Sequence, residues 1–187
     1  MPSPSSFSDR PAVLVADLAQ LDMLRSRARG RVTDLVYAAG ELTVSEIAEA
    51  LDQKPTAMYR HLDALVGCGL LIEGEPVRTG KTLARVFAAP AKRIEFPREE
   101  ASAEERSAVA DILDSQLRLA GKEARADIEA PGGSSVRSGS GIGWLTEKER
   151  VRVAKLLAEA LAIVEGGQRG EGKSLCGVTY ALRPVSR

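Results

Sequence analysis

The chain has 187 residues, of which 44% are hydrophobic and 28% charged, a balance typical of a folded globular protein. Its 26 basic and 26 acidic side chains cancel, which argues against a protein that coats nucleic acid regardless of sequence. No apolar run approaches the roughly 20 residues needed to cross a bilayer, and the N-terminal residues lack the basic and apolar segments of an export signal. We therefore expect a cytoplasmic protein without a membrane partner.

Soft metal ligands and paired cysteines are scarce in this sequence. Cys68 and Cys176 lie far apart, and His61 is the one histidine. Without a Cys-x-x-Cys or His-x-x-x-His spacing, the sequence indicates neither a disulfide framework nor a transition-metal site. We expect no metal and no cofactor, and we expect Cys68 to be packed in a turn. A redox role for either cysteine and the existence of a small-molecule effector stay open.

The N-terminal part is predicted to be helical after a short disordered start. Residues 1–10 are rich in Ser and Pro, and Asp9 can cap a helix that begins near Pro11. A second helix is expected over residues 29–39, where Gly40 can end it. The densest basic run in the chain consists of Arg25, Arg27, Arg29 and Arg31. Alternate residues of a helix point in different directions, so at most two of these arginines share a face.

Two short helices joined by a tight turn follow. Thr43 and Glu46 are spaced as a capping box, which predicts the start of a helix of about two turns. After the polar break of residues 52–54, Pro55 stands at a first-turn position and opens a second helix. The inward side of that second helix is predicted to consist of Met58, Leu62, Leu65 and Val66. This spacing is typical of a helix-turn-helix.

A hairpin is predicted directly after the second helix. Residues 70–73 and 82–88 have the composition of strands, and residues 74–81 between them are rich in turn formers. A hairpin in this place is a wing, so the pattern predicts a winged helix-turn-helix.

With these elements the chain resembles the ArsR-like winged-helix regulators. The similarity runs from about residue 21 to residue 89, and it is clearest in residues 42–51 and 55–65. His61-Leu62-x-x-Leu65 at the end of the second helix, then a small residue, Gly and Leu, is typical of the group. The resemblance implies dimeric, sequence-specific binding of double-stranded DNA. The metal-ligand cysteines of the metal-sensing members have no counterpart here.

The C-terminal half is expected to be a helical dimerisation and regulatory region. A long amphipathic helix is predicted over about residues 99–128, a flexible loop over residues 131–143, and a strand over residues 174–182. Thr146 and Glu149 form a second capping box, and Trp144 before it is expected to anchor the core. The inward residues of the helix that follows are predicted to be Val151, Ala154, Leu157, Ala158, Leu161 and Val164. Such wide apolar stripes need a partner surface, and a second copy of the chain is the simplest one.

The fold class predicted is mainly α with a small β-hairpin wing. We expect a disordered segment of residues 1–10, a winged helix-turn-helix domain of residues 11–95 and the C-terminal region of residues 96–187. The dimer is expected to form through the first helix and the C-terminal helices. Its two recognition helices would then lie about one DNA turn apart on a pseudo-palindromic site.

The candidate DNA contacts follow from which side of the second helix is buried. The residues expected to meet DNA are Lys54, Thr56, Ala57, Tyr59 and Arg60 at the second helix and Arg78, Thr79 and Lys81 in the wing. Arg60 can pair bidentately with guanine. Lys54 replaces the serine N-cap usual in the family, which forgoes about 1 kcal/mol of capping but places a cation where a phosphate would lie. The alternative is that these are ordinary solvated residues.

Two other functions are open to this sequence. A protein-interaction scaffold that keeps the fold but reads no DNA is favoured by the neutral charge and by Asp63. Asp63 and Glu75 would repel phosphate if they lay close to it. A nucleotide-binding loop is suggested by Gly80-Lys81-Thr82, but five residues separate Gly74 from Gly80 where that motif has four. The segment after it also has the pattern of a strand instead of a helix. We therefore expect no enzyme.

Overall fold

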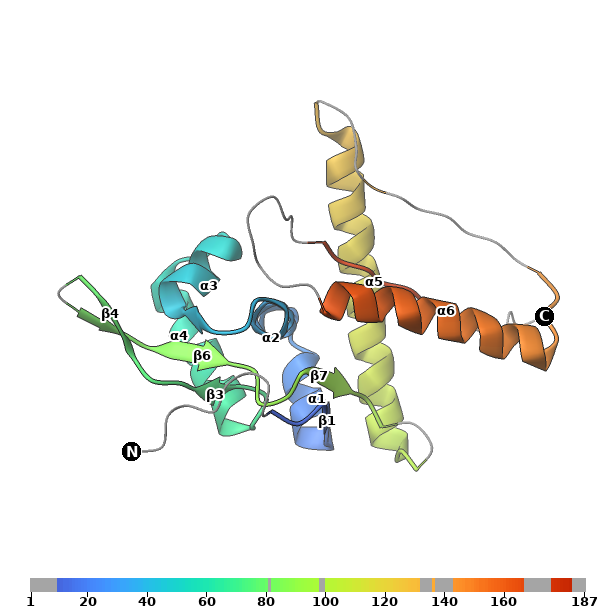
Figure 1. Ribbon diagram of the computed structural model, residues 1–187, viewed down its shortest axis with the longest axis horizontal. Helices are drawn as coiled ribbons and strands as arrows, with labels where there is room; N and C mark the ends of the chain where they lie inside the picture. Colours follow the sequence, from blue (N-terminus) through green and yellow to red (C-terminus); the bar gives the residue numbers. More distant parts are fainter. Residues whose placement is uncertain are drawn as a thin grey trace. The chain divides into compact units, whose positions relative to one another are not determined.

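The computed structural model describes residues 10–80, 82–97, 100–131, 136, 143–166 and 176–182. Its helices are α1 (Leu18–Leu24), α2 (Arg27–Ala39), α3 (Val44–Ala50), α4 (Pro55–Gly67), α5 (Ala103–Glu129) and α6 (Glu147–Glu165) (Figure 1). Its strands are β1 (Val13–Val15), β2 (Leu42–Thr43), β3 (Ile72–Glu73), β4 (Val77–Thr79), β5 (Thr82–Ala84), β6 (Val86–Ala88) and β7 (Arg93–Glu95). The chain divides into two compact units, Met1–Leu113 and Asp114–Arg187, and α5 contributes to both.

The first unit begins differently from the prediction. The helix expected from Pro11 is wrong, because Val13–Val15 form β1, which pairs in parallel with β7, and α1 starts only at Leu18. The β-branched run favours a strand. Asp17 then supplies a full capping box, since Asp17 Oδ1 accepts from the Gln20 amide at 2.8 Å and Gln20 Oε1 accepts from the Asp17 amide at 3.1 Å. The expected cap, Asp9, lies outside the described residues.

Helices α2, α3 and α4 pack around one hydrophobic core, as the sequence predicts. Gly40 ends α2 with a positive φ of 88°, a conformation that glycine adopts without strain. The capping box of α3 is confirmed, because the Glu46 amide donates to Thr43 Oγ1 at 3.3 Å and Glu46 Oε2 accepts from the Thr43 amide at 2.8 Å. The largest buried side chains of this core are Phe87, Leu21, Ile47, Leu62, Leu65, Leu70 and Leu71.

Two small sheets complete the winged part. Strands β2, β6 and β3 form an antiparallel sheet in that order, and β4 pairs with β5 in a separate hairpin that extends beyond it (Figure 1). The strand predicted over residues 82–88 is interrupted at Arg85, which separates β5 from β6. The strand predicted over residues 70–73 is shortened, because the amides of Leu70 and Leu71 donate to the Leu65 carbonyl and so continue the end of α4.

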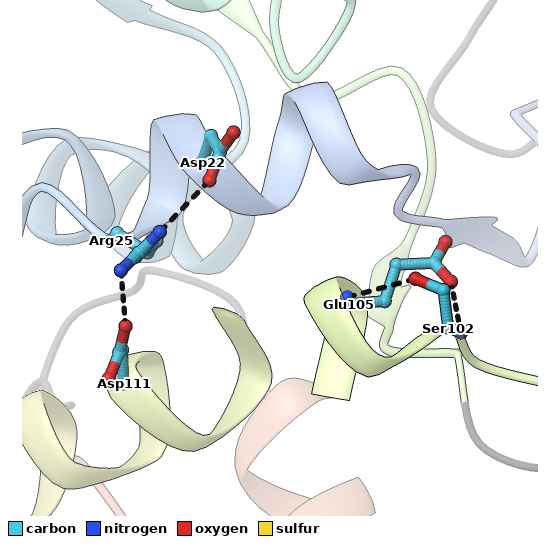
Figure 2. Close-up of polar contacts among 5 residues, drawn as sticks. All are labelled: Asp22, Arg25, Ser102, Glu105 and Asp111. Atoms are coloured by element: carbon cyan, nitrogen blue, oxygen red, sulfur yellow. Dashed lines mark hydrogen bonds and ion pairs between the residues drawn. The ribbon is translucent and has the colours of Figure 1, made fainter. Parts of the chain in front are cut away.

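The start of α5 is tied to the first unit. Ala108 and Ile112 are buried in its core. Arg25, after α1, donates to Asp22 at 3.3 Å and to Asp111 of α5 at 2.5 Å (Figure 2). Ser102 and Glu105 exchange hydrogen bonds in the manner of a capping box, also drawn in Figure 2.

The second unit contains the end of α5 and the whole of α6, and its apolar residues are largely uncovered. The capping box at Thr146 is confirmed, and α6 ends at Gly166 as predicted. Trp144 is 89% exposed, so its expected role as a core anchor is wrong. Residues 176–182 form no strand, which contradicts that prediction over its described part. Most of the predicted loop of residues 131–143 lies outside the described residues.

Among the described residues, no helix combines the length and the apolar content needed to cross a membrane.

Candidate nucleic-acid interface

Helix α4 packs into the hydrophobic core through one side. It begins at Pro55, and its residues Met58, Leu62 and Leu65 are at most 3% exposed, as the sequence predicts. These side chains pack into the core that α4 shares with α2 and α3. The helix is therefore a rigid element with a fixed rotation about its axis.

The opposite side of α4 is open. Thr56, Ala57 and Arg60 are exposed, and Tyr59 is 43% exposed. These four residues occupy the first two turns, from which a recognition helix reaches the base edges of the major groove. The structure thus brings together, on one uncovered face, the helix residues that the sequence singled out.

The turn before α4 is tight and polar. Asp52 has a positive φ of 52°, a left-handed conformation that lets the chain reverse between α3 and α4. A shallow open hollow is lined by Asp52, Gln53, Lys54 and Ala57. Lys54 is the N-cap residue of α4, and its side chain makes no capping hydrogen bond. Lys54 is exposed, and it directly precedes the backbone amides at the start of the helix, where anions bind.

The wing presents fewer of its predicted contacts. Arg78 and Thr79 on β4 are exposed, and Arg78 lies opposite Leu83 of β5, which is 70% exposed. Gly80 forms the tip with a positive φ of 62°. Lys81 lies outside the described residues. The segment that follows it, Thr82–Ala84, is a strand, so the helix that a phosphate-binding loop requires is missing at this point of the described chain.

An ion-pair cluster joins α4 to the base of the wing, and sequence reasoning missed it. Arg85 donates to Glu73 through Nε at 2.7 Å and through Nη2 at 2.8 Å, and Arg85 Nη2 lies 2.9 Å from Asp63 Oδ1. The guanidinium hydrogen bond lowers the pKa of Glu73, and the same bond raises the pKa of Arg85. Asp63, which we expected to repel phosphate, is thus paired. The available signal was a lone arginine inside an apolar strand pattern.

Part of the arginine run is already engaged in the fold. Arg25 pairs with Asp22 and Asp111, and Arg29 Nε donates to the Met23 carbonyl at 2.9 Å. Arg25 thereby links the end of α1 to α5, and Arg29 links α2 to α1. Around the turn after α4, Cys68 is half-buried and its thiol donates to the Leu65 carbonyl at 3.3 Å.

Within the described residues, no group of three or more His, Cys, Asp and Glu side chains is placed to hold a metal ion.

The comparison with known protein families agrees with this arrangement at the level of the domain. Residues 24–75, from the end of α1 past β3, match the family model of a helix-turn-helix domain. Together with the β4–β5 hairpin, this match shows that the chain carries a winged helix-turn-helix. No curated protein matches the chain.

Solved structures are similar to the chain at low sequence identity. YusO protein from Bacillus subtilis is 16% identical, with 78% of this chain and 82% of that chain covered and a TM-score of 0.34. RV1404 from Mycobacterium tuberculosis is 19% identical, with 82% of each chain covered and a TM-score of 0.33.

Proposed function

We propose that the chain is a sequence-specific, DNA-binding transcriptional regulator of the ArsR-like type that acts as a homodimer on a pseudo-palindromic site. The observation that carries this proposal is the open face of α4. A helix fixed by Met58, Leu62 and Leu65 on one side presents Thr56, Ala57, Tyr59 and Arg60 on the other. This is the geometry that reads a major groove. No enzymatic activity is part of the proposal.

Each candidate residue has a distinct role in it. Arg60 pairs with a guanine, Thr56 and Ala57 contact a thymine methyl group, and Tyr59 bonds to a base or a phosphate. Lys54 meets a phosphate at the start of α4. In the wing, Arg78, Thr79 and Lys81 contact the backbone or the minor groove, which positions the protein without specifying sequence.

The homodimer is supported by the uncovered apolar side chains of α6. The half-buried Val153 and the exposed Leu156, Ala160 and Ile163 recur at spacings of three and four, which is the pattern of a helix that pairs with another helix. Leu156 is 55% exposed and Ile163 is 78% exposed. On the side of α6 that the sequence predicted to face inward, only Leu157, Leu161 and Val164 are half-buried, whereas Val151, Ala154 and Ala158 are exposed. A second copy of α6 would cover the exposed stripe with an identical one.

The decisive experiment is selection of bound DNA from a random pool, followed by titration of the selected site over a series of salt concentrations. The full chain is expected to enrich one pseudo-palindromic sequence and to bind it less tightly as salt rises. Arg60→Ala should weaken the selected site by about 1–3 kcal/mol and relax the preference at one base pair of each half-site. Arg93→Ala, at an exposed arginine of the same domain that pairs with Glu95, is the matched control.

The second candidate function is the protein-interaction scaffold, favoured by the neutral net charge and by the exposed Glu75. A scaffold would enrich no sequence and would show no affinity difference between Arg60→Ala and Arg93→Ala. Either result would contradict the proposed function as a DNA-binding regulator and would support the function as a scaffold.

A further inference from the structure

The wing hairpin has little packing of its own to hold it in one direction. Its strands β4 and β5 form a sheet separate from the β2–β6–β3 sheet. All the described residues of β4 are exposed, and β5 contributes only Ala84 at half-burial. The connections to the rest of the domain are residues 74–76 on one strand and Arg85 on the other. A two-stranded hairpin is marginally stable in water, so its direction depends on what fixes these two connections.

Arg85 is fixed on three sides. Its guanidinium forms a two-pronged bond to Glu73, at the end of β3, and a further ion pair with Asp63, on the exposed side of α4. It also lies over the ring of Phe87, 5.0 Å from the ring centre, and Phe87 is fully buried. Isolated surface ion pairs contribute little, but a bidentate arginine in a network is the exception.

We infer that Arg85 is a positioning residue that clamps the wing at a set angle to helix α4, so that Arg78 reaches the DNA backbone while α4 occupies the groove. The inference rests on the proposed function, because it assigns how the two DNA-contacting elements are held relative to each other. Glu73 and Asp63 are the partners through which Arg85 acts.

The same geometry argues against Arg85 as a direct phosphate contact. Its Nε and Nη2 are engaged with two carboxylates, so the cluster as a whole is anionic. An anionic cluster does not attract a phosphate, whereas it can set the direction of a strand. Arg85 therefore affects DNA binding through the wing.

The first test uses the free protein and needs no DNA. In ¹⁵N relaxation measurements, the backbone amides of the wing, residues 77–79 and 82–84, should be about as ordered as those of α4 in the wild-type chain. In Arg85→Met, which still covers Phe87 but lacks the ion pairs, the wing amides should become markedly more mobile while α4 stays unchanged. Wing amides that are equally ordered in both proteins would overturn the clamp.

Charge is controlled by a second variant. Asp63→Asn combined with Arg85→Met removes one negative and one positive charge, so the cluster keeps its net charge but loses the clamp. We expect this double variant to show the same mobile wing as Arg85→Met alone. Arg85→Lys keeps the positive charge without the planar fork, and it should give a wing of intermediate mobility. A wing restored to full order by either variant would show that charge, and not the clamp, is responsible.

The second test is a double-mutant cycle on the selected DNA site. Arg78→Ala should weaken binding about fivefold in the wild-type chain, and it should weaken binding little further once Arg85→Met is present. Arg78 lies opposite Leu83 in the β4–β5 hairpin, whereas Arg85 follows the end of β5. Non-additive effects would therefore indicate that Arg85 acts on Arg78 through the position of the wing. Additive effects would overturn the inference, and Arg93→Met should be additive with Arg78→Ala.

The two failures are distinguishable. A wild-type chain that enriches no DNA sequence contradicts the proposed function, and the order of the wing in the free protein still decides whether Arg85 is a clamp. A chain that enriches a sequence but shows additive effects of Arg78→Ala and Arg85→Met keeps the function and contradicts the clamp.

Discussion

Helices α4 and α6 share the same kind of amphipathic pattern, but their apolar residues have different surroundings. Both start with a strong signal, Pro55 in one and the Thr146 capping box in the other, and both repeat apolar residues at three and four. In α4 three of these residues are buried in the core of the first unit, whereas no residue of α6 is buried. An amphipathic pattern indicates that a face needs covering, but it does not indicate what covers it.

The largest effect is expected where the core of the first unit is opened. Leu62→Ala should lower the free energy of unfolding by about 3 kcal/mol, because Leu62 is fully buried and its loss leaves a cavity. The same change at Leu83, which is exposed on the wing, should cost less than about 0.5 kcal/mol. Urea titrations followed by circular dichroism measure both. Equal losses at the two sites would show that α4 is not anchored as described.

The second prediction tests what covers α6. Ile163→Asp should raise the dissociation constant of the homodimer by about a hundredfold or more, since a carboxylate would have to be buried in an apolar interface. Val151→Asp is the matched control, because Val151 is also exposed on α6 but lies outside the stripe of Leu156 and Ile163. Sedimentation equilibrium measures both variants. Equal weakening by the two variants, or a wild-type chain that is monomeric throughout, would contradict pairing through this stripe.

The same contrast explains what could be predicted from the sequence. The capping boxes at Thr43 and Thr146, the Pro55 start and the buried side of α4 are local signals, and the structure confirms each of them. The N-terminal helix was wrong because a stronger capping signal, Asp17 with Gln20, lies a few residues further along. The exposure of Trp144 depends on which segments pack nearby, and sequence spacing does not contain that information.

The candidate site divides in the same way. The outward residues of α4 follow from helical periodicity alone, so Arg60 and its neighbours could be named in advance. Arg85 could not, because its partners Glu73 and Asp63 come from a different strand and a helix, and their proximity depends on the register of β3 against β6. Side chains that join elements distant in sequence are visible only once the fold is known.

The third prediction weighs stability against binding at the start of α4. Lys54→Ser should stabilise the fold by about 1 kcal/mol, because a serine N-cap can accept a hydrogen bond that the lysine side chain does not. The same change should weaken DNA binding if Lys54 meets a phosphate. Thermal unfolding and a DNA titration measure the two effects. Lys92→Ser, at an exposed lysine elsewhere in the domain, controls for the lost charge. Unchanged affinity for DNA would reject the role given to Lys54.

The last prediction concerns a buried polar group in the first unit. The hydroxyl of Tyr37, on α2, is buried and has no hydrogen-bond partner among the described residues. Burial, with a smaller contribution from nearby Cys68, raises the pKa of Tyr37 to about 12. A buried polar group without a partner costs about 1–3 kcal/mol. Tyr37→Phe should therefore raise the free energy of unfolding at pH 7 by about 1 kcal/mol. Tyr59→Phe, at an exposed hydroxyl, should change it little.

The pH dependence gives that prediction a sign. The folded chain holds the Tyr37 proton more tightly than the unfolded chain, where the pKa is about 10, so ionisation of Tyr37 does not lower the free energy of unfolding below pH 10. Between pH 10 and the raised pKa of about 12 in the folded protein, only the unfolded chain ionises readily, and the free energy of unfolding falls. The wild-type chain should therefore lose stability over this interval more steeply than Tyr37→Phe, which has no phenol to ionise. Urea titrations at neutral pH and above pH 10 compare the two. Parallel losses in both proteins would mean that the Tyr37 hydroxyl is accessible to water, and the core of the first unit would then be less tightly closed at α2 than at α4.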